Sequence, residues 1–266
     1  MALHRGNEWF GTHLSRGQRA VVTPDGFTLY ARRFHANRRM QAGAFEPDET
    51  ALLRRHLDAE CVFVDVGANI GYYTALARQA GAHVVAIEPQ PQNLASLYAT
   101  LLVNGWADDA RTEVFPLGLG AQPGLLIVYG ASGPSASLVR GWAGYADRTR
   151  QTIPLTTLDT LLSDRFPGRR LVIKIDVEGA EDGVLRGAGR TLAREPRPVW
   201  LVEICLHEFH PTGVNPDYAA TFDHFWRHGY AACTADGAAR QVTPADVARW
   251  VAAGRTDAET FNFLFT

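Results

Sequence analysis

The sequence contains few cysteines and no long apolar run. Cys61, Cys205 and Cys233 each lie in a short apolar segment, and no two of them have a CxxC spacing. This argues against a disulfide framework and a zinc site, so we expect reduced, buried thiols. No apolar stretch approaches the roughly 20 residues that cross a bilayer, and the N-terminus lacks the apolar core of a secretory signal. We therefore expect a cytoplasmic protein without a membrane span.

The sequence also lacks an excess of positive charge. Lys and Arg number 26 against 28 Asp and Glu, which gives a net charge of -2 at pH 7. Arginines are enriched in the first forty residues, and we interpret them as a solvated basic face. Without an overall basic field, nucleic acid is not an expected partner. The 266 residues, 46% of them hydrophobic, can bury one substantial core.

From Cys61 onward, short β-branched runs alternate with helical patterns, which is typical of βαβ units around a parallel sheet. The seven predicted strands have the sequences CVFVDV, HVVAIE, TEVFPLG, LVIKID, VWLVEI, YAACTA and TFNFLFT. The predicted helices among them span residues 72–80, 91–104, 180–187 and 218–227. Gly81, Gly105 and Gly229 each follow a helical stretch, where a left-handed C-terminal cap favours glycine.

Two regions fall outside this alternation. Residues 1–60 form a predicted N-terminal extension, with a hairpin in TPDGFTLYARRF and a helix from Pro47 to Leu57, before a domain of residues 61–266. An insertion at about 119–157 carries the extra strand LLIVYG and a Gly- and Ser-rich loop. Because long loops in compact domains are usually functional or mobile, we expect this loop to form part of a substrate wall or lid.

The turn GANIG directly follows the first predicted strand. That strand should bring Asp65 and the turn to the carboxyl edge of the sheet, where open α/β folds bind ligands. Gly67 and Gly71 permit close backbone approach, and the following helix presents its positive dipole end. A dinucleotide site needs GxGxxG, but Asn69 stands where the second glycine is required. A nicotinamide cofactor is therefore disfavoured.

Glu88 ends the next strand 23 positions after Asp65, about where an acidic residue binds ribose hydroxyls in such folds. A ribose with a small zwitterionic tail and no pyrophosphate describes S-adenosylmethionine. Asp65 would face the amino group of its methionine moiety, and the turn would face its carboxylate. The predicted cofactor-binding residues are Asp65, Gly67, Ala68, Asn69, Gly71, Tyr72, Glu88, Pro89, Asn93, Gly118 and Asp176.

Several segments together resemble one known family, the FkbM-type S-adenosylmethionine-dependent methyltransferases. They are FVDVGANIGYYT, AIEPQPQNLASL, TLDTLL, LVIKIDVEGAEDGVLRGA and NFLFT, and the resemblance covers roughly residues 45–266. IKIDVEGAE is the specific segment, since many methyltransferases share the glycine turn. The resemblance implies an α/β class I methyltransferase fold, Rossmann-like, with a seven-stranded, mostly parallel sheet. Its last strand, residues 261–265, is expected to run antiparallel.

Ionisable residues gather where the strand LVIKID ends. Strand alternation places Lys174 and Asp176 on one side. Methyl transfer needs an aligned acceptor and, for an alcohol, removal of its proton. We predict that Asp176 is a positioning or base carboxylate oriented by Lys174, with a structural ion pair as the alternative. Glu178 and Glu181 could also serve the dipole of the following helix.

The strand VWLVEI delivers a second polar group. Glu203 interrupts an apolar strand and should face the cleft, because burying an unpartnered carboxylate is costly. His207 is a candidate general base by its intrinsic pKa, with an ordinary surface histidine as the alternative, which is preferred for His210. Asp176, Glu203 and His207 could instead bind a divalent metal, but no tight ligand spacing supports this, and no metal is predicted.

Four residues are predicted to contact the acceptor: Glu178, Ser135, Ser137 and Trp142. The two serines match a Ser-containing segment of the family, although serine is also an ordinary turn residue. Trp142 and Tyr145 could stack on a sugar or belong to the core. Asp159, in TLDTLL, is interpreted as a helix N-cap.

The leading prediction is O-methylation of a sugar hydroxyl or of a glycosylated or natural-product metabolite by S-adenosylmethionine. An N-methyltransferase acting on a peptide side chain or amine is the runner-up, because cofactor motifs do not report the acceptor. A non-catalytic nucleoside-binding protein and an NAD-dependent oxidoreductase are more distant alternatives. The acceptor is thus a small molecule, glycan or peptide, and a homo-oligomer is left open.

Overall fold

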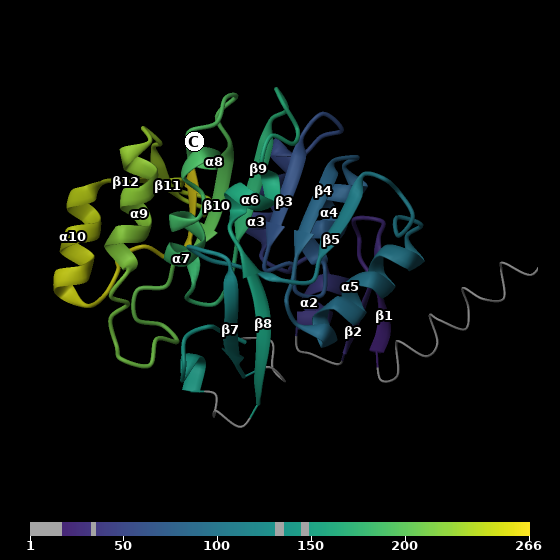
Figure 1. Cartoon of the computed structure of the whole chain (residues 1–266), viewed down its shortest axis with the longest axis horizontal. Coiled ribbons are helices and arrows are strands. Elements are labelled where there is room, and N and C mark those ends of the chain that lie inside the picture. Colours follow the sequence, from purple (N-terminus) through teal and green to yellow (C-terminus); the bar gives the residue numbers. More distant parts are fainter. Residues whose placement is uncertain (1–17, 33–35, 131–135, 145–148) are drawn as a thin grey trace, which may run out of the picture. The chain divides into compact units, whose positions relative to one another are not determined.

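The computed structural model describes residues 18–32, 36–130, 136–144 and 149–266 (Figure 1). Ser135 and Tyr145 lie outside these ranges. The chain forms two compact units, Met1–Pro116 and Leu117–Thr266. The division expected at residue 60 stays a prediction.

The first unit contains a parallel sheet. Strands β3 (Val62–Val66), β4 (His83–Ile87) and β5 (Thr112–Phe115) pair in that order, all parallel. Every residue of β3 is buried, as expected of a parallel strand covered on both faces. Helix α4 (Tyr72–Gln79) follows β3, and α5 (Pro91–Val103) follows β4. Both helices agree with their predicted spans to within one residue at each end, and Gly81 and Gly105 have the expected positive φ of 87° and 74°.

The N-terminal elements of the first unit are anchored by side chains of α5. Strands β1 (Gln18–Val22) and β2 (Thr28–Arg32) form the predicted hairpin, followed by α2 (Ala36–Gln41) and α3 (Pro47–His56). Asn104 accepts a hydrogen bond from Thr28 N at 2.9 Å and donates one to Thr28 O at 2.6 Å. Thr100 accepts from Tyr30 N at 3.0 Å. These amide and hydroxyl groups satisfy edge groups of β2 that a further strand would otherwise pair with.

The second unit contains the end of the sheet pattern. Strands β9 (Leu171–Ile175) and β10 (Val199–Glu203) are parallel, and β13 (Asn262–Phe265) runs antiparallel to β10, as predicted. Strand β11 (Ala232–Thr234) also pairs antiparallel with β13. A two-residue strand that was not predicted, β12 (Gln241–Val242), is added to β11. It is too short to show a period in sequence.

The insertion contains the predicted strand and two strands that were not predicted, which together form a small sheet. Strands β6 (Gly118–Leu119), β8 (Arg150–Thr156) and β7 (Gly124–Tyr129) lie in the order β6-β8-β7, and a short 3-10 turn, η1, spans Trp142–Gly144. Val128, Ile153 and Leu155 form its core. Strand β8 was missed because it contains Pro154 and alternates only weakly between apolar and polar residues.

The remaining helices cover the second unit's strands or follow them. They are α6 (Leu158–Leu162), α7 (Glu181–Arg186), α8 (Gly189–Leu192), α9 (Tyr218–Arg227) and α10 (Pro244–Ala253). Helix α9 packs on β13, with the rings of Phe225 and Phe265 stacked at 3.7 Å between centroids. Within the described ranges, no helix combines the length and apolar character needed to cross a membrane.

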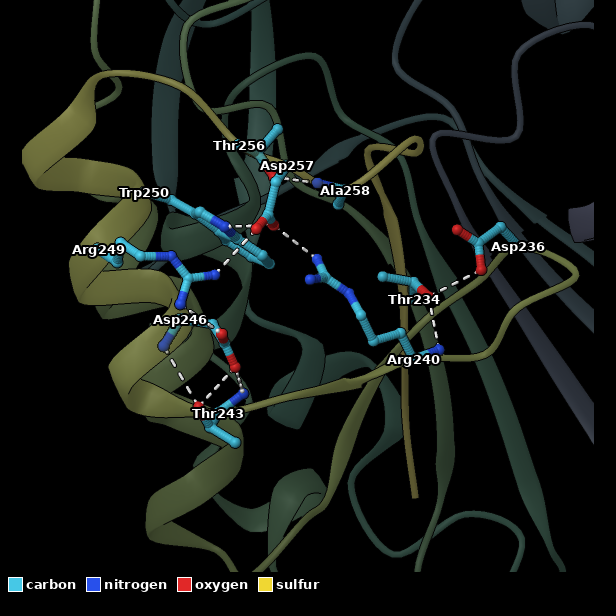
Figure 2. Close-up of polar contacts among 10 residues, drawn as sticks. All are labelled: Thr234, Asp236, Arg240, Thr243, Asp246, Arg249, Trp250, Thr256, Asp257 and Ala258. Carbon is cyan, nitrogen blue, oxygen red and sulfur yellow. Dashed lines mark hydrogen bonds and ion pairs between the residues drawn. The ribbon is translucent and has the colours of Figure 1, made fainter.

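Helix α10 was not predicted, although its start carries a clear signal. Thr243 and Asp246 form a reciprocal capping box. Asp257, just beyond the helix, accepts hydrogen bonds from the Trp250 indole N–H at 2.7 Å, from Arg240 at 2.7 Å and from Arg249 at 3.0 Å (Figure 2). This carboxylate ties the helix to the segment that leads into β13.

Candidate active site

The glycine turn after β3 has a backbone that few residues can adopt. Gly67, Asn69 and Gly71 have φ values of 88°, 49° and 90°. A Cβ on Gly71 would lie 2.5 Å from Leu97 Cδ1, so α5 leaves no room for a side chain there. This positive φ and close approach explain the second glycine of GANIG.

Most N–H groups of the turn are bonded within the protein. Those of Gly67 and Ala68 both donate to Ile87 O at 3.0 Å, and that of Gly71 donates to Ala68 O at 2.8 Å. These N–H groups therefore already have acceptors in the protein. The predicted contact of the turn with a ligand carboxylate stays a prediction. The positive end of the α4 dipole still lies at this turn, since Ala75 N opens the helical ladder by donating to Gly71 O.

Glu88 clamps the turn to the loop after β4. Its Oε2 accepts from Asn69 N at 2.8 Å, and its Oε1 accepts from Gln90 N at 2.8 Å and from Asn93 Nδ2 at 3.2 Å. Burial raises the pKa of Glu88 to about 7, while these three donors favour the charged form. Glu88, the residue predicted to bind the ribose, therefore lies beside Asn93. Pro89 stands between Glu88 and Gln90 in the chain.

Two other predicted cofactor residues in the first unit are buried among protein groups. Asp65 accepts from Thr74 Oγ1 of α4 at 2.6 Å. Tyr72 packs edge-on against Phe27 and Phe45 of the N-terminal elements, at 5.8 and 4.8 Å between centroids. Its ring is thus part of that unit's core, and its cofactor-binding role stays a prediction.

The second unit carries the ion pair expected at the end of β9. Lys174 Nζ lies 2.7 Å from Asp176 Oδ2, with side-chain exposures of 3% and 27%. The buried ammonium of Lys174 fixes the direction of this partly exposed carboxylate. Lys174 and Asp176 are therefore on one side, as the strand alternation indicated.

Two further carboxyls surround this pair. Burial, followed by repulsion from Asp176, raises the pKa of Glu203 well above its usual range, while Lys174 acts in the opposite direction. Burial likewise raises the pKa of Glu181 to about 7, although its Oε1 accepts from Gly179 N at 3.0 Å. The sequence suggested only a helix-start role for Glu181. Glu181 is the second glutamate of VEGAE, and this acidic motif is the feature of the sequence that could have predicted its position near Asp176.

Glu178 is held by the insertion. Its Oε2 accepts from the Trp142 indole N–H at 2.7 Å, and its carbonyl oxygen accepts from Ser137 Oγ. Trp142 is only 2% exposed and lies against Gly179. Three of the four predicted acceptor residues are therefore joined, but Trp142 is buried and does not offer a free ring for a sugar to stack on.

The histidines after β10 are less closely tied to the carboxyls. The His207 side chain is 47% exposed and pairs with Glu208, 3.0 Å from Nδ1 to Oε1. His210 Nδ1 lies 3.0 Å from Thr212 Oγ1, and burial lowers its pKa. The catalytic role of His207 stays a prediction, and no group in the described ranges joins three or more potential metal-ligating side chains.

Two further predicted residues have structural positions in the second unit. Gly118 lies in β6, where a Cβ would come within 2.6 Å of Leu155. Asp159 is not the N-cap of α6, because Thr157 fills that place and accepts from Thr160 N. Asp159 instead accepts from the N–H groups of Arg190 and Thr191, both at 2.8 Å, and so holds the start of α8. Only the tertiary fold reveals this partner.

The sequence of the chain matches a known protein family. The family model described as "Methyltransferase FkbM domain" matches residues 65–232, which is more than half of the chain. The chain belongs to this family. The expected family is thereby confirmed, and with it a methyltransferase domain. The parallel strands of both units and the antiparallel β13 agree with the class I methyltransferase fold expected of an FkbM-type protein.

One curated relative has a more specific name. The hexuronic acid methyltransferase AglP of Haloferax volcanii is 29% identical over 173 residues. The match covers 64% of this FkbM-family chain and 64% of AglP, so the chain matches just under two thirds of that relative's length.

Solved structures similar to the chain include two methyltransferases. An rRNA methylase from Streptococcus thermophilus is 14% identical, with a TM-score of 0.42, covering 83% of this chain and 92% of that one. An S-adenosylmethionine-dependent methyltransferase from Agrobacterium tumefaciens is 9% identical, with a TM-score of 0.44, covering 94% and 70%. These values mark distant similarities.

Proposed function

We propose that this FkbM-family protein methylates a hydroxyl group of a sugar, using S-adenosylmethionine and releasing S-adenosylhomocysteine. The observation that carries the proposal is the partly exposed carboxylate of Asp176, fixed by the buried Lys174 at 2.7 Å and flanked by the carboxyl of Glu203. An alcohol acceptor must lose a proton as it attacks, and a directed carboxylate can accept it.

The first unit supplies the proposed cofactor site. Glu88 would accept from the ribose hydroxyls, and Asp65 would face the amino group of the methionine moiety. The GANIG turn suits the carboxylate of the methionine moiety because the positive end of the α4 dipole lies there. When bound, S-adenosylmethionine supplies the electrophilic methyl group on its sulfonium.

The second unit supplies the proposed acceptor chemistry. Asp176 would accept the proton that the acceptor hydroxyl loses as it is methylated. Lys174 would hold Asp176 in its orientation. Glu178, fixed by Trp142 and Ser137, would accept a hydrogen bond from a neighbouring hydroxyl of the sugar. Burial and the nearby charge of Asp176 raise the pKa of Glu203, which favours its neutral form beside the proposed acceptor.

The similarity to AglP supports a sugar as the acceptor, since that relative is named for methylation of a hexuronic acid. Carboxylates that direct a hydroxyl would also serve an amine, so the test must include both acceptor types.

Binding tests the cofactor half. Calorimetric titration with S-adenosylmethionine and S-adenosylhomocysteine should give saturable binding to the wild type and at least about tenfold weaker binding to Glu88→Ala, because ribose hydrogen bonds to a charged group are lost. Asp108→Ala, which removes an exposed acid in the same unit, is the matched control. No binding to the wild type would overturn the cofactor assignment.

Turnover tests the acceptor half. S-adenosylhomocysteine release should be measured with neutral hexosides, hexuronosides and amines. With a sugar accepted, Asp176→Asn should lower kcat by about 100-fold or more. Asp164→Asn, at an exposed position, is the control. Turnover on amines alone, or full activity of Asp176→Asn, would contradict the proposal.

A further inference from the structure

Strand β7 presents an apolar edge. Leu125, Leu126 and Ile127 are consecutive and are 71%, 47% and 39% exposed. In the order β6-β8-β7, this strand is the last one, and among the named strands of the described ranges it pairs with β8 alone. No residue of β7 is charged. Exposed edges in natural proteins are commonly blocked by charges or proline, and this one has neither.

The hydrogen bonds around β7 show which backbone groups point outward. Gly130 N donates to Thr149 O, so the pair Gly130 and Thr149 belongs to the β7–β8 ladder. Tyr129 has its N–H and C=O on the other side, where both exchange hydrogen bonds with Ser137. The direction of the backbone N–H and C=O groups alternates from one residue to the next along a strand. Those of Leu125 and Ile127 therefore point the same way as those of Tyr129, away from β8.

These outward groups are bounded at both ends. Tyr129 is already bridged to Ser137, and Pro123 has no N–H to offer beyond Gly124. Across the part of the chain that the structure describes, no strand pairs with the outward side of Leu125 and Ile127. The segment available for pairing is therefore short and centred on Leu126.

We propose that β7 pairs with β7 of a second copy of this chain, antiparallel about a two-fold axis through Leu126. The axis places Leu125 opposite the partner's Ile127, and each such pair exchanges two hydrogen bonds. Leu126 then faces its own copy in a non-hydrogen-bonded pair. The strand is uncharged and self-complementary in this register, so no like charges oppose each other across the axis.

A second copy fits this edge better than an unrelated partner does. The outward donors and acceptors alternate symmetrically about one residue, as an isologous contact requires. The three large aliphatic side chains would leave water in both copies at once. The contact is small, so the expected dimer is weak and its population rises with concentration.

Two substitutions test the association. Sedimentation velocity over a concentration series should show a monomer–dimer equilibrium for the wild type. Ile127→Pro removes an outward N–H and leaves the β7–β8 ladder bonds in place, and it should abolish the dimer. Leu126→Lys should raise the dimer Kd by about tenfold or more, since two ammonium groups would meet at the axis. Val103→Lys, at an exposed position of α5, should not change the Kd.

Cysteine cross-linking tests the register. Leu126→Cys places two thiols opposite each other at about 4.5 Å between Cα atoms, within disulfide range. It should give a covalent dimer under mild oxidation, while Leu125→Cys, opposite Ile127, and the wild type with its own free cysteines should not. A wild type that stays monomeric at every concentration, a dimer that survives both Ile127→Pro and Leu126→Lys, or equal cross-linking at positions 125 and 126 would overturn the proposal.

Discussion

Gly179 lies directly against the indole ring of Trp142. A Cβ on Gly179 would be 2.5 Å from Trp142 Cζ3, and the φ of Gly179 is +92°. The same indole donates to Glu178, the preceding residue. Trp142 thus fixes both the path of the backbone after β9 and the direction of the neighbouring carboxylate.

Gly179→Ala should destabilise the protein by about 2–4 kcal/mol, because it combines overpacking with a strained left-handed backbone. In a Trp142→Ala background the same change should cost less, since only the backbone strain remains. Urea unfolding of the four proteins measures this. Gly183→Ala, a position in α7 with nothing within 4 Å of its Cβ, should instead be neutral or stabilising. Equal costs in both backgrounds would show that the ring contact is unimportant.

Asp159→Ala should lower stability by about 1–2 kcal/mol and loosen the start of α8, because the N–H groups of Arg190 and Thr191 lose their acceptor. Amide hydrogen exchange should accelerate at those two residues. Thr157→Ala is the comparison, since it removes the N-cap of α6 and should act on Thr160 instead. If Asp159→Ala accelerates amide exchange in α6 alone, Asp159 caps that helix, as the sequence indicated.

Stability should fall as the pH rises from about 4.5 to 7, in part through Glu181. Its folded pKa, about 7, lies above the ordinary value of 4.5, so the native state binds more protons in that window. The stabilisation by protonated Glu181 is complete below pH 4.5 and is lost as the pH rises through 7. The free energy of unfolding falls by about 3 kcal/mol over this range through this group. Glu181→Gln, which cannot ionise, should flatten this slope in unfolding curves, whereas the exposed Glu259→Gln should not. An unchanged slope would place the titration elsewhere.

Asp257→Asn should cost about 1 kcal/mol at neutral pH, because it weakens the bonds from Arg240, Arg249 and Trp250 that Figure 2 shows, in an exposed setting that screens charge. Those bonds, led by Arg240, lower the pKa of Asp257 to about 2. The stabilisation is thus present above pH 3.8 and lost as the pH falls through 2. The stability difference between the two proteins should therefore shrink below pH 3.8. Asp223→Asn, in a helical pair with Arg227, is a milder control.

Local chemistry made several elements predictable. Helices α4, α5 and α9 follow from apolar periodicity closed by glycines, and Gly81, Gly105 and Gly229 all have positive φ. Strand alternation also predicted that Lys174 and Asp176 lie together, because residues i and i+2 of a strand point to one side.

Side-chain partners distant in sequence could not be predicted in this way. Tyr72 is drawn into the N-terminal core by Phe27 and Phe45, which no motif indicates. Strand β8 forms despite Pro154 because it has β6 and β7 to pair with. In each case the deciding contact joins segments far apart in the chain.

The sequence by itself determined the main alternation of strands and helices, the glycine turn and the acidic residues at the strand ends, because these depend on local periodicity and on residue types at fixed spacing. The FkbM relationship followed from the resemblance of several segments. Only the tertiary structure decided that Glu88 clamps the turn, that Trp142 is buried against Gly179 and that Leu125 and Ile127 of β7 pair on one side alone among the residues that the structure describes. Burial and hydrogen-bond partners belong to the packed chain, and no local pattern encodes them.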